Sequence, residues 1–144
     1  MKKLILLAFV ALAGVACGDT GDTFYVTEGA QPQTATITVN ANEWRWLNNG
    51  EQAYYWVVKP APIITNNVFR NGMVQMYYTF TDDGTPIQQP LPYTMWLRED
   101  DVFYSETIEF DFEQGYVMIR YIISDFMPFD NGLGSLNFRL VVVN

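Results

Sequence analysis

Apolar and polar residues alternate with a period of two along most of the chain after residue 22. In the clearest stretch, three apolar residues alternate with three acidic ones: Ile108, Phe110 and Phe112 with Glu109, Asp111 and Glu113. β-Branched and aromatic residues are common in these stretches, and turn-forming residues recur about every ten positions. This pattern is typical of antiparallel β-strands that bury one face.

Residues 107–123 are expected to form a hairpin with a two-residue turn at residues 114–115. In this register the apolar side chains of the two strands meet on one face, and Glu109 faces Arg120 across the ladder. A three-residue bulged turn remains the alternative, and it would place Arg120 opposite Ile108. The pairing of opposite charges favours the two-residue turn.

The same alternation predicts six further strands, at residues 23–27, 34–40, 53–59, 73–81, 93–98 and 136–143. Turn-forming residues lie at positions 71–72, 82–84 and 130–132. Two prolines and two adjacent asparagines interrupt the pattern between Pro60 and Gly72, where we expect an irregular crossover with one helical turn. These elements predict an all-β fold, an antiparallel two-sheet β-sandwich of the immunoglobulin-like, Greek-key type with about seven or eight strands and very little helix.

The first sixteen residues follow a different pattern. Lys2 and Lys3 carry positive charge, residues 4–12 are apolar, and residues 14–16 are small. This order is typical of a secretory signal peptide, and the apolar run is shorter than the roughly 20 residues that a membrane-spanning helix needs. We therefore expect a signal peptide at 1–16, a tether at 17–22 and a β-sandwich domain at 23–144.

Cys17 is the only cysteine of the 144-residue chain and stands where the mature protein would begin. A cysteine at this position resembles the lipobox of bacterial lipoproteins, in which the thiol is acylated, although Gly14 replaces the usual Leu-like residue. The alternative is an ordinary secretory signal followed by a spare thiol. Two or more acyl chains anchor a protein stably, so we expect Cys17 to be the membrane anchor. Gly18 after it, rather than Asp, favours the outer membrane and the cell surface.

Net charge and residue types exclude several functions. Removing Lys2 and Lys3 leaves six basic and sixteen acidic residues, which is a net charge of 6 − 16 = −10. Such a chain repels phosphate backbones, so nucleic acid is not an expected partner. The chain has no histidine, so Ser-His and Cys-His nucleophiles and His-based zinc sites are excluded. A carboxylate glycosidase is the remaining enzymatic alternative, and we expect a protein without catalytic activity.

Aromatic residues are the first candidates for ligand binding. Trp44 and Trp46 lie on the same side of an extended segment, and Tyr54 and Trp56 follow closely in the sequence. Aromatic rings on an outer face can stack on sugar rings. The alternative is that at least one ring of each alternating pair fills the core.

A loop near the end of the chain holds a second group of candidates: Phe126, Met127 and Phe129. An apolar loop tip can bind a partner, because exposed apolar patches often mark interaction sites. The same loop could instead fold over the end of the sandwich as a plug.

Acidic residues provide a third, weaker candidate. Glu109, Asp111 and Glu113 project from one face of one predicted strand. Calcium prefers oxygen ligands of this kind, so Ca²⁺ is a conceivable cofactor. The alternative is an ordinary solvated strand face.

Five short motifs occur in order over residues 34–144: Trp44 to Trp46, Ile64-Thr65-Asn66-Asn67-Val68 with Asn71-Gly72-Met73-Val74, Leu91-Pro92-Tyr93-Thr94, Gly115-Tyr116-Val117-Met118-Ile119, and Phe138-Arg139-Leu140-Val141-Val142-Val143. In this order the chain resembles a family of small, uncharacterised lipoproteins of Bacteroidota, some of which carry collagen-like Gly-x-y tracts. The present chain has no such tract. The resemblance implies an envelope location and a C-terminal all-β domain, and it brings no known activity.

Together these features predict a cell-envelope lipoprotein with a non-catalytic β-sandwich that serves as a binding or structural module. The expected partners are the membrane, through the lipid anchor, and an envelope protein, a second copy of the chain or a polysaccharide. A carbohydrate-binding module that uses surface aromatics is the first alternative, and a carboxylate-dependent glycosidase is the second.

Overall fold

The computed structural model describes residues 31–144, so the predicted signal peptide, Cys17 and the strand expected at 23–27 lie outside the described residues. Nine strands follow one another in the described chain: β1 (Gln33–Val39), β2 (Arg45–Asn48), β3 (Ala53–Pro60), β4 (Met73–Asp82), β5 (Thr85–Pro90), β6 (Tyr93–Glu99), β7 (Val102–Glu113), β8 (Tyr116–Ile123) and β9 (Leu136–Val143). A 3-10 turn, η1 (Ala41–Glu43), precedes β2, and a short helix, α1 (Asn66–Asn71), precedes β4.

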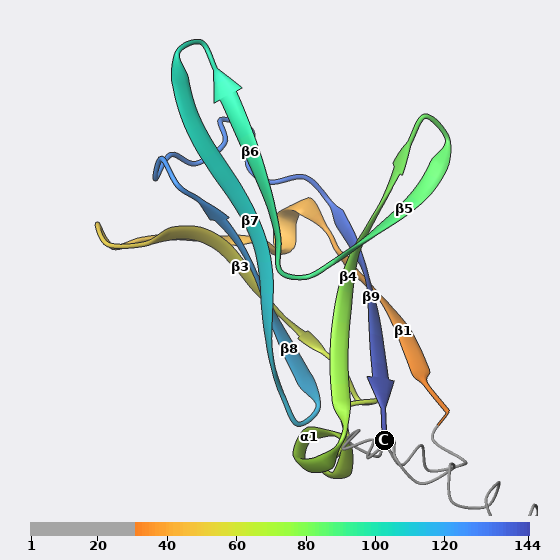
Figure 1. Cartoon of the computed structure of the whole chain (residues 1–144). Helices are drawn as coiled ribbons and strands as arrows, with labels where there is room; N and C mark the ends of the chain where they lie inside the picture. The colour runs from red at the N-terminus through yellow and green to blue at the C-terminus, as the bar shows by residue number, and fades with distance from the viewer. Residues whose placement is uncertain (1–30) are drawn as a thin grey trace, which may run out of the picture.

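The strands form two antiparallel sheets that enclose the core (Figure 1). The four-stranded sheet has the order β1-β9-β4-β5, and the five-stranded sheet has the order β2-β3-β8-β7-β6. The chain passes from one sheet to the other after β1, β3, β5 and β8. The predicted two-sheet β-sandwich is therefore confirmed, with nine strands in residues 31–144 rather than seven or eight.

The β7–β8 hairpin has the register that the sequence predicts. Glu109 pairs with Arg120 in the ladder, and the turn includes Gly115 at a φ of +83°. Glycine adopts this left-handed backbone readily because it has no Cβ. Ile108 and Phe110 of β7 meet Tyr121 and Ile119 of β8 on the core side as expected, whereas Phe112, opposite Val117, is 39% exposed near the turn.

Two strands and part of a third were not predicted. β2 has only four residues, and β5 contains Pro86 and Pro90. Proline cannot donate to a ladder, and β5 tolerates it because this strand is at the edge of its sheet. β7 begins at Val102 rather than at residue 107, because its first residues pair with β6 although Phe103 and Tyr104 interrupt the alternation.

The crossover between Pro60 and Gly72 contains one short helix, as the sequence predicts. The side chain of Thr65 caps α1, with its Oγ1 accepting a hydrogen bond from the Val68 N–H at 3.2 Å. Gly72 follows the helix because no Cβ fits there: an added Cβ would lie 2.9 Å from the Val68 Cα and would also meet the carbonyl oxygen of Val143.

Side chains from both sheets fill the core. The most deeply buried residues are Val39, Met76, Phe138, Leu140 and Val142 from the four-stranded sheet, Ile108, Val117 and Ile119 from the five-stranded sheet, and Ile64 from the crossover. Burial of these side chains is the main source of stability in such a fold. Within residues 31–144, no helix is long and apolar enough to cross a membrane.

The base of the sandwich brings together the start of β1, the end of β9 and helix α1 (Figure 1). Gln33 pairs with Val142, and the side-chain amide of Asn67 donates to that of Asn144. The hairpins β4–β5 and β6–β7 stand apart at the opposite end, the far end (Figure 1). The described chain therefore starts at the base, away from the two projecting hairpins.

Candidate functional site

The outer faces of the two sheets differ in chemistry. Because neighbouring side chains along a strand point to opposite faces, the ladders identify the outward residues. On the four-stranded sheet these are mostly polar, namely Thr34, Thr36, Thr38, Gln75, Tyr77, Thr79, Gln88, Asn137 and Arg139, together with the apolar Met73, Val141 and Val143. On the five-stranded sheet an outer apolar face is formed by Leu47, Tyr54, Trp56, Val58, Tyr116, Met118 and Ile122. The outer face of the five-stranded sheet is thus the more apolar of the two, although Arg120 on β8, opposite Trp56, interrupts it.

Strands β3 and β8 are apolar on both of their faces. Their sequences, AYYWVVKP and YVMIRYII, hardly alternate. Runs of this kind are typical of strands that are covered on both sides, whereas a strand with one face in water alternates. On the outer side, however, Val58 and Tyr116 are each 47% exposed. The composition of these two strands fits a sheet whose outer face is covered by another molecule.

A charged cluster begins within this face, at Arg120 on β8, which lies opposite Trp56. Arg120 Nε donates to Glu109 Oε1 at 2.7 Å, and Arg120 Nη2 lies 2.7 Å from Asp111 Oδ2. Burial disfavours the charge of Arg120, but the hydrogen bond to Glu109 and the two nearby carboxylates outweigh this effect and raise its pKa. The two carboxylates come from one strand and bind one guanidinium, rather than facing each other across a cleft.

This cluster also bears on the predicted calcium site. Two of the three candidate ligands, Glu109 and Asp111, are engaged with Arg120. In the part of the chain that the structure describes, no group of three or more His, Cys, Asp or Glu side chains could hold a metal ion. The calcium hypothesis therefore gains no support from the geometry.

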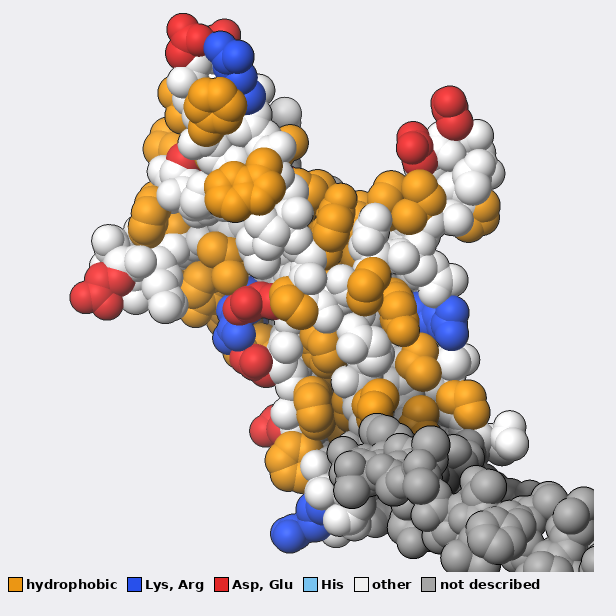
Figure 2. All heavy atoms as spheres, viewed as in Figure 1, with side chains coloured by type: hydrophobic (Ala, Val, Ile, Leu, Met, Phe, Trp, Pro, Cys, Tyr) orange, Lys and Arg blue, Asp and Glu red, His pale blue; other side chains and the backbone are white. Residues whose placement is uncertain are grey.

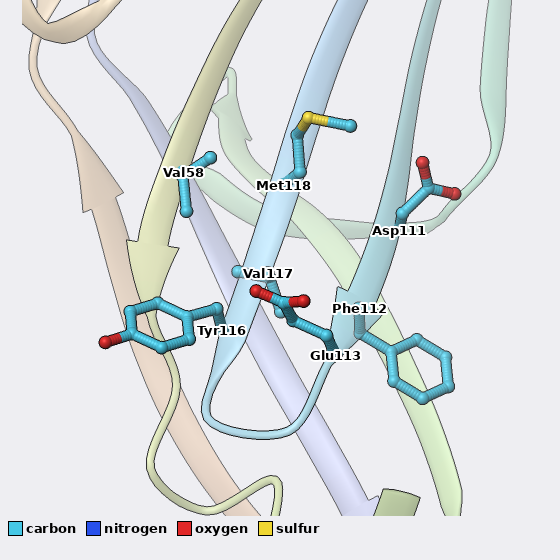
Figure 3. Close-up of a pocket in the computed structure, with 7 residues that line it drawn as sticks. All are labelled: Val58, Asp111, Phe112, Glu113, Tyr116, Val117 and Met118. Carbon is cyan, nitrogen blue, oxygen red and sulfur yellow. The ribbon is translucent and has the colours of Figure 1, made fainter.

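Hollows occur at both ends of the outer apolar face. The turn hollow, about 250 Å³, lies next to the β7–β8 turn. Figure 3 shows its lining, with Val58, Met118 and Tyr116 on β3 and β8 and Glu113 near the turn. The far-end hollow, about 470 Å³, lies between the start of β3 and the end of β8. Tyr54, Arg120, Ile122 and Phe126 are among the residues that line it.

Trp44 and Trp46 pack against the core rather than on the outer apolar face. Trp44 Nε1 donates to the carbonyl oxygen of Gly134 at 3.0 Å, which ties the start of β2 to the last loop. The ring of Trp46 lies 4.7 Å from that of the buried Tyr55. The alternative considered for these rings, a place in the core, is thus the one that the geometry fits.

Tyr54 and Trp56 lie on the outer apolar face, two residues apart on β3. Arg45 from β2 holds its guanidinium 5.2 Å from the centre of the Trp56 ring. A cation over an indole face is attracted by the ring quadrupole. These two aromatic residues are therefore placed where a ligand can reach them, and a third hollow of about 540 Å³ lies beside Trp56 and Arg45.

The loop between β8 and β9 combines both roles considered for it. The ring of Phe129 stacks on Tyr55 at 5.9 Å, and its N–H donates to the Tyr55 hydroxyl at 2.9 Å. Leu133 is buried beside them in the core. Phe126 and Met127 are exposed instead, and Phe126 lines the far-end hollow. The second half of the loop thus plugs the sandwich, and the first half is available to a ligand.

The β6–β7 hairpin carries two exposed aromatics that were not among the candidates. Trp96 is 81% exposed and Phe103 is 74% exposed, with Arg98 held 5.2 Å from the Phe103 ring centre. Figure 2 shows hydrophobic side chains along the projecting hairpins and the notch between them. Trp96 shares its side of β6 with the polar residues Thr94 and Arg98, which is the side that faces water.

Comparison of the chain with protein-family models, with curated proteins and with solved structures finds no match. Any inference about function therefore rests on the sequence and the geometry of this chain.

Proposed function

We propose that this protein is a non-catalytic binding module of the bacterial cell envelope, anchored through acylated Cys17, and that the outer apolar face is its binding surface. The observation that carries the proposal is the composition of β3 and β8, which are apolar on the core side and on the outer side alike. A partner that covers the outer side would remove this second set of apolar side chains from water.

The energetics favour such a partner. Removing apolar surface from water contributes roughly 25 cal/mol per Å², and large exposed apolar patches commonly mark interaction sites. Val58 and Tyr116 are among the most exposed members of the face. The opposite outer face carries more threonines and amides, and its apolar members Met73, Val141 and Val143 lie near the base.

Charge limits the kind of partner. The predicted mature chain carries sixteen acidic and six basic residues, which disfavours acidic partners and a second copy of the chain alike. A neutral or basic partner agrees with this charge. The charged cluster of Arg120, Glu109 and Asp111 is internally paired and adds little net repulsion beside the face.

Thiol labelling in intact cells tests the proposal, because the predicted acylation of Cys17 leaves an introduced cysteine as the reactive thiol. We would compare Val58→Cys, on the outer apolar face, with Thr36→Cys, on the other outer face, using a membrane-permeant maleimide. We expect Val58→Cys to react several-fold more slowly in cells than as purified protein, and Thr36→Cys to react at similar rates in both. Equal rates for Val58→Cys in both settings would contradict a covered face.

A further inference from the structure

We infer that the far-end hollow binds a sugar ring of a neutral polysaccharide, and that the chain of sugars continues along the outer apolar face. This inference rests on the proposed function and names the ligand class of the same face. The hollow, about 470 Å³, has the size of a typical ligand site. Its walls come from the β2–β3 turn, from the outer sides of β3 and β8, and from the loop after β8.

Two aromatic rings line this hollow. Tyr54 lies opposite Leu47 on β2 and Ile122 on β8, so apolar side chains flank it on both neighbouring strands. Phe126 approaches from the loop after β8 and is 42% exposed. Aromatic faces offer broad apolar contact to the C–H side of a sugar ring, and a tyrosine hydroxyl adds a hydrogen-bonding group.

Phe126 is held in place by its backbone. Its φ of +64° is uncommon for a bulky residue, and backbone outliers of this kind occur often at binding sites. The N–H of Phe126 donates to the carbonyl oxygen of Ile123, and its own carbonyl oxygen accepts from Asn48 Nδ2, both at 3.3 Å. The next N–H, of Met127, donates to Asp125 Oδ1 at 3.0 Å. These contacts tie the backbone of the loop to the β2–β3 hairpin, which reduces the loop ordering that binding would cost.

Polar groups beside the rings match the needs of sugar hydroxyls. A guanidinium has five N–H groups, and the contacts of Arg120 with Glu109 and Asp111 use two of them among the described residues. Glu109 uses Oε1 for this contact, which leaves Oε2 as an acceptor at the same wall. The amide of Gln52 adds a donor and an acceptor. Donors and acceptors thus lie next to two apolar rings, which is the combination that a polyhydroxylated ring requires.

The charge of the hollow disfavours an anionic sugar. Glu51 and Glu109 line it together with a single cation, Arg120. An anionic sugar would meet this local excess of negative charge as well as the acidic chain around it.

The position of Trp56 indicates a ligand of more than one sugar. Trp56 follows Tyr54 on the same side of β3, about 7 Å further along the strand. A polysaccharide that stacks on Tyr54 can therefore also reach Trp56 and Arg45. We expect longer oligosaccharides to bind more tightly than monosaccharides, because each added ring buries further apolar surface.

The test is titration of the acylated mature protein in detergent micelles with soluble neutral polysaccharides, namely a mixed-linkage β-glucan, a xyloglucan, a galactomannan and a dextran. Polygalacturonate serves as the anionic comparison. We expect at least one neutral polymer to bind, and Tyr54→Ala and Phe126→Ala each to weaken it about tenfold or more. Tyr77→Ala is the matched control, since Tyr77 is likewise a half-buried tyrosine on a strand but lies on the other outer face.

Each outcome decides a different point. Binding that is equal in wild type, Tyr54→Ala and Phe126→Ala would overturn the site, and equal or stronger binding of polygalacturonate would overturn the neutral class. Tyr54→Phe keeps the ring, and its affinity should stay within a few-fold of wild type. This variant tests whether a loss of binding in Tyr54→Ala comes from the missing ring rather than from a misfolded protein. If no polymer binds while Val58→Cys stays protected in cells, the sugar inference fails and the proposed function stands. If that protection is also missing, both fail.

Discussion

The hydroxyl of Tyr121 on β8 donates a hydrogen bond to the carboxylate of Glu106 on β7, inside the sandwich. Glu106 is 6% exposed and is the one buried charged side chain among residues 31–144. Burial of the phenol, together with the hydrogen bond and charge of Glu106, raises the pKa of Tyr121 far above its ordinary value. Tyr121 therefore stays protonated in the folded protein and supplies the donor that the carboxylate needs.

Replacing Tyr121 with Phe should destabilise the fold by roughly 1–3 kcal/mol, because it leaves the carboxylate of Glu106 without this donor. Urea unfolding followed by circular dichroism measures the change. The double variant Tyr121→Phe with Glu106→Met should recover part of the loss, since removing both partners avoids an unsatisfied buried group. A Tyr121→Phe protein as stable as wild type would show that the bond contributes nothing.

Gly72 should not tolerate a side chain. An added Cβ would meet the carbonyl oxygen of Val143 and approach the backbone of Val68, neither of which is a flexible side-chain end. We expect Gly72→Ala to cost about 1–3 kcal/mol of unfolding free energy, as overpacking typically does. Gly134→Ala is the control, because nothing lies within 4 Å of its added Cβ and its φ is not positive. Similar losses for the two variants would contradict the close approach at Gly72.

Lys59 and Glu43 form an ion pair at 2.8 Å that links β3 to the turn before β2. The hydrogen bond from Lys59, and next that from the Asn40 N–H, lower the pKa of Glu43 below its usual 4.5. A carboxylate with a lowered pKa contributes stability above its unfolded pKa and loses it as the pH falls through the folded pKa. Glu43→Gln should therefore lower the melting temperature at pH 7 but make little difference at a pH well below 4.5. A difference of the same size at both pH values would exclude this carboxylate as its source.

Cys17 should determine whether the protein is attached to the membrane. If its thiol is acylated, Cys17→Ser removes the lipid, and the protein should move from the membrane fraction to the soluble exported fraction. Incorporation of labelled palmitate should be lost in parallel. Palmitate incorporation that persists in Cys17→Ser would contradict lipidation at this residue, and an unlabelled wild-type protein would favour an ordinary secretory signal.

Local pattern determined much of the fold. The β7–β8 hairpin is predictable because its register depends on neighbouring residues, with apolar side chains at every second position and Glu109 opposite Arg120. Strand β5 escaped prediction because Pro86 and Pro90 argue against a strand, and only a place at the edge of a sheet makes them acceptable. The buried Glu106 was also missed, since its partner Tyr121 lies on another strand and no local signal distinguishes this acid from an exposed one.

The sequence by itself determined an antiparallel two-sheet sandwich, because the alternation of apolar and polar residues identifies most of the strands. It could not determine which side of β3 would be the core, because both sides of that strand are apolar and the period-two pattern does not distinguish them. Packing against the four-stranded sheet decided this point: Tyr55 and Val57 are buried inside, and Tyr54, Trp56 and Val58 lie outside. The candidate site exists because the four-stranded sheet covers only one side of the five-stranded sheet, and the apolar side chains on the other side stay outside the core of the described chain.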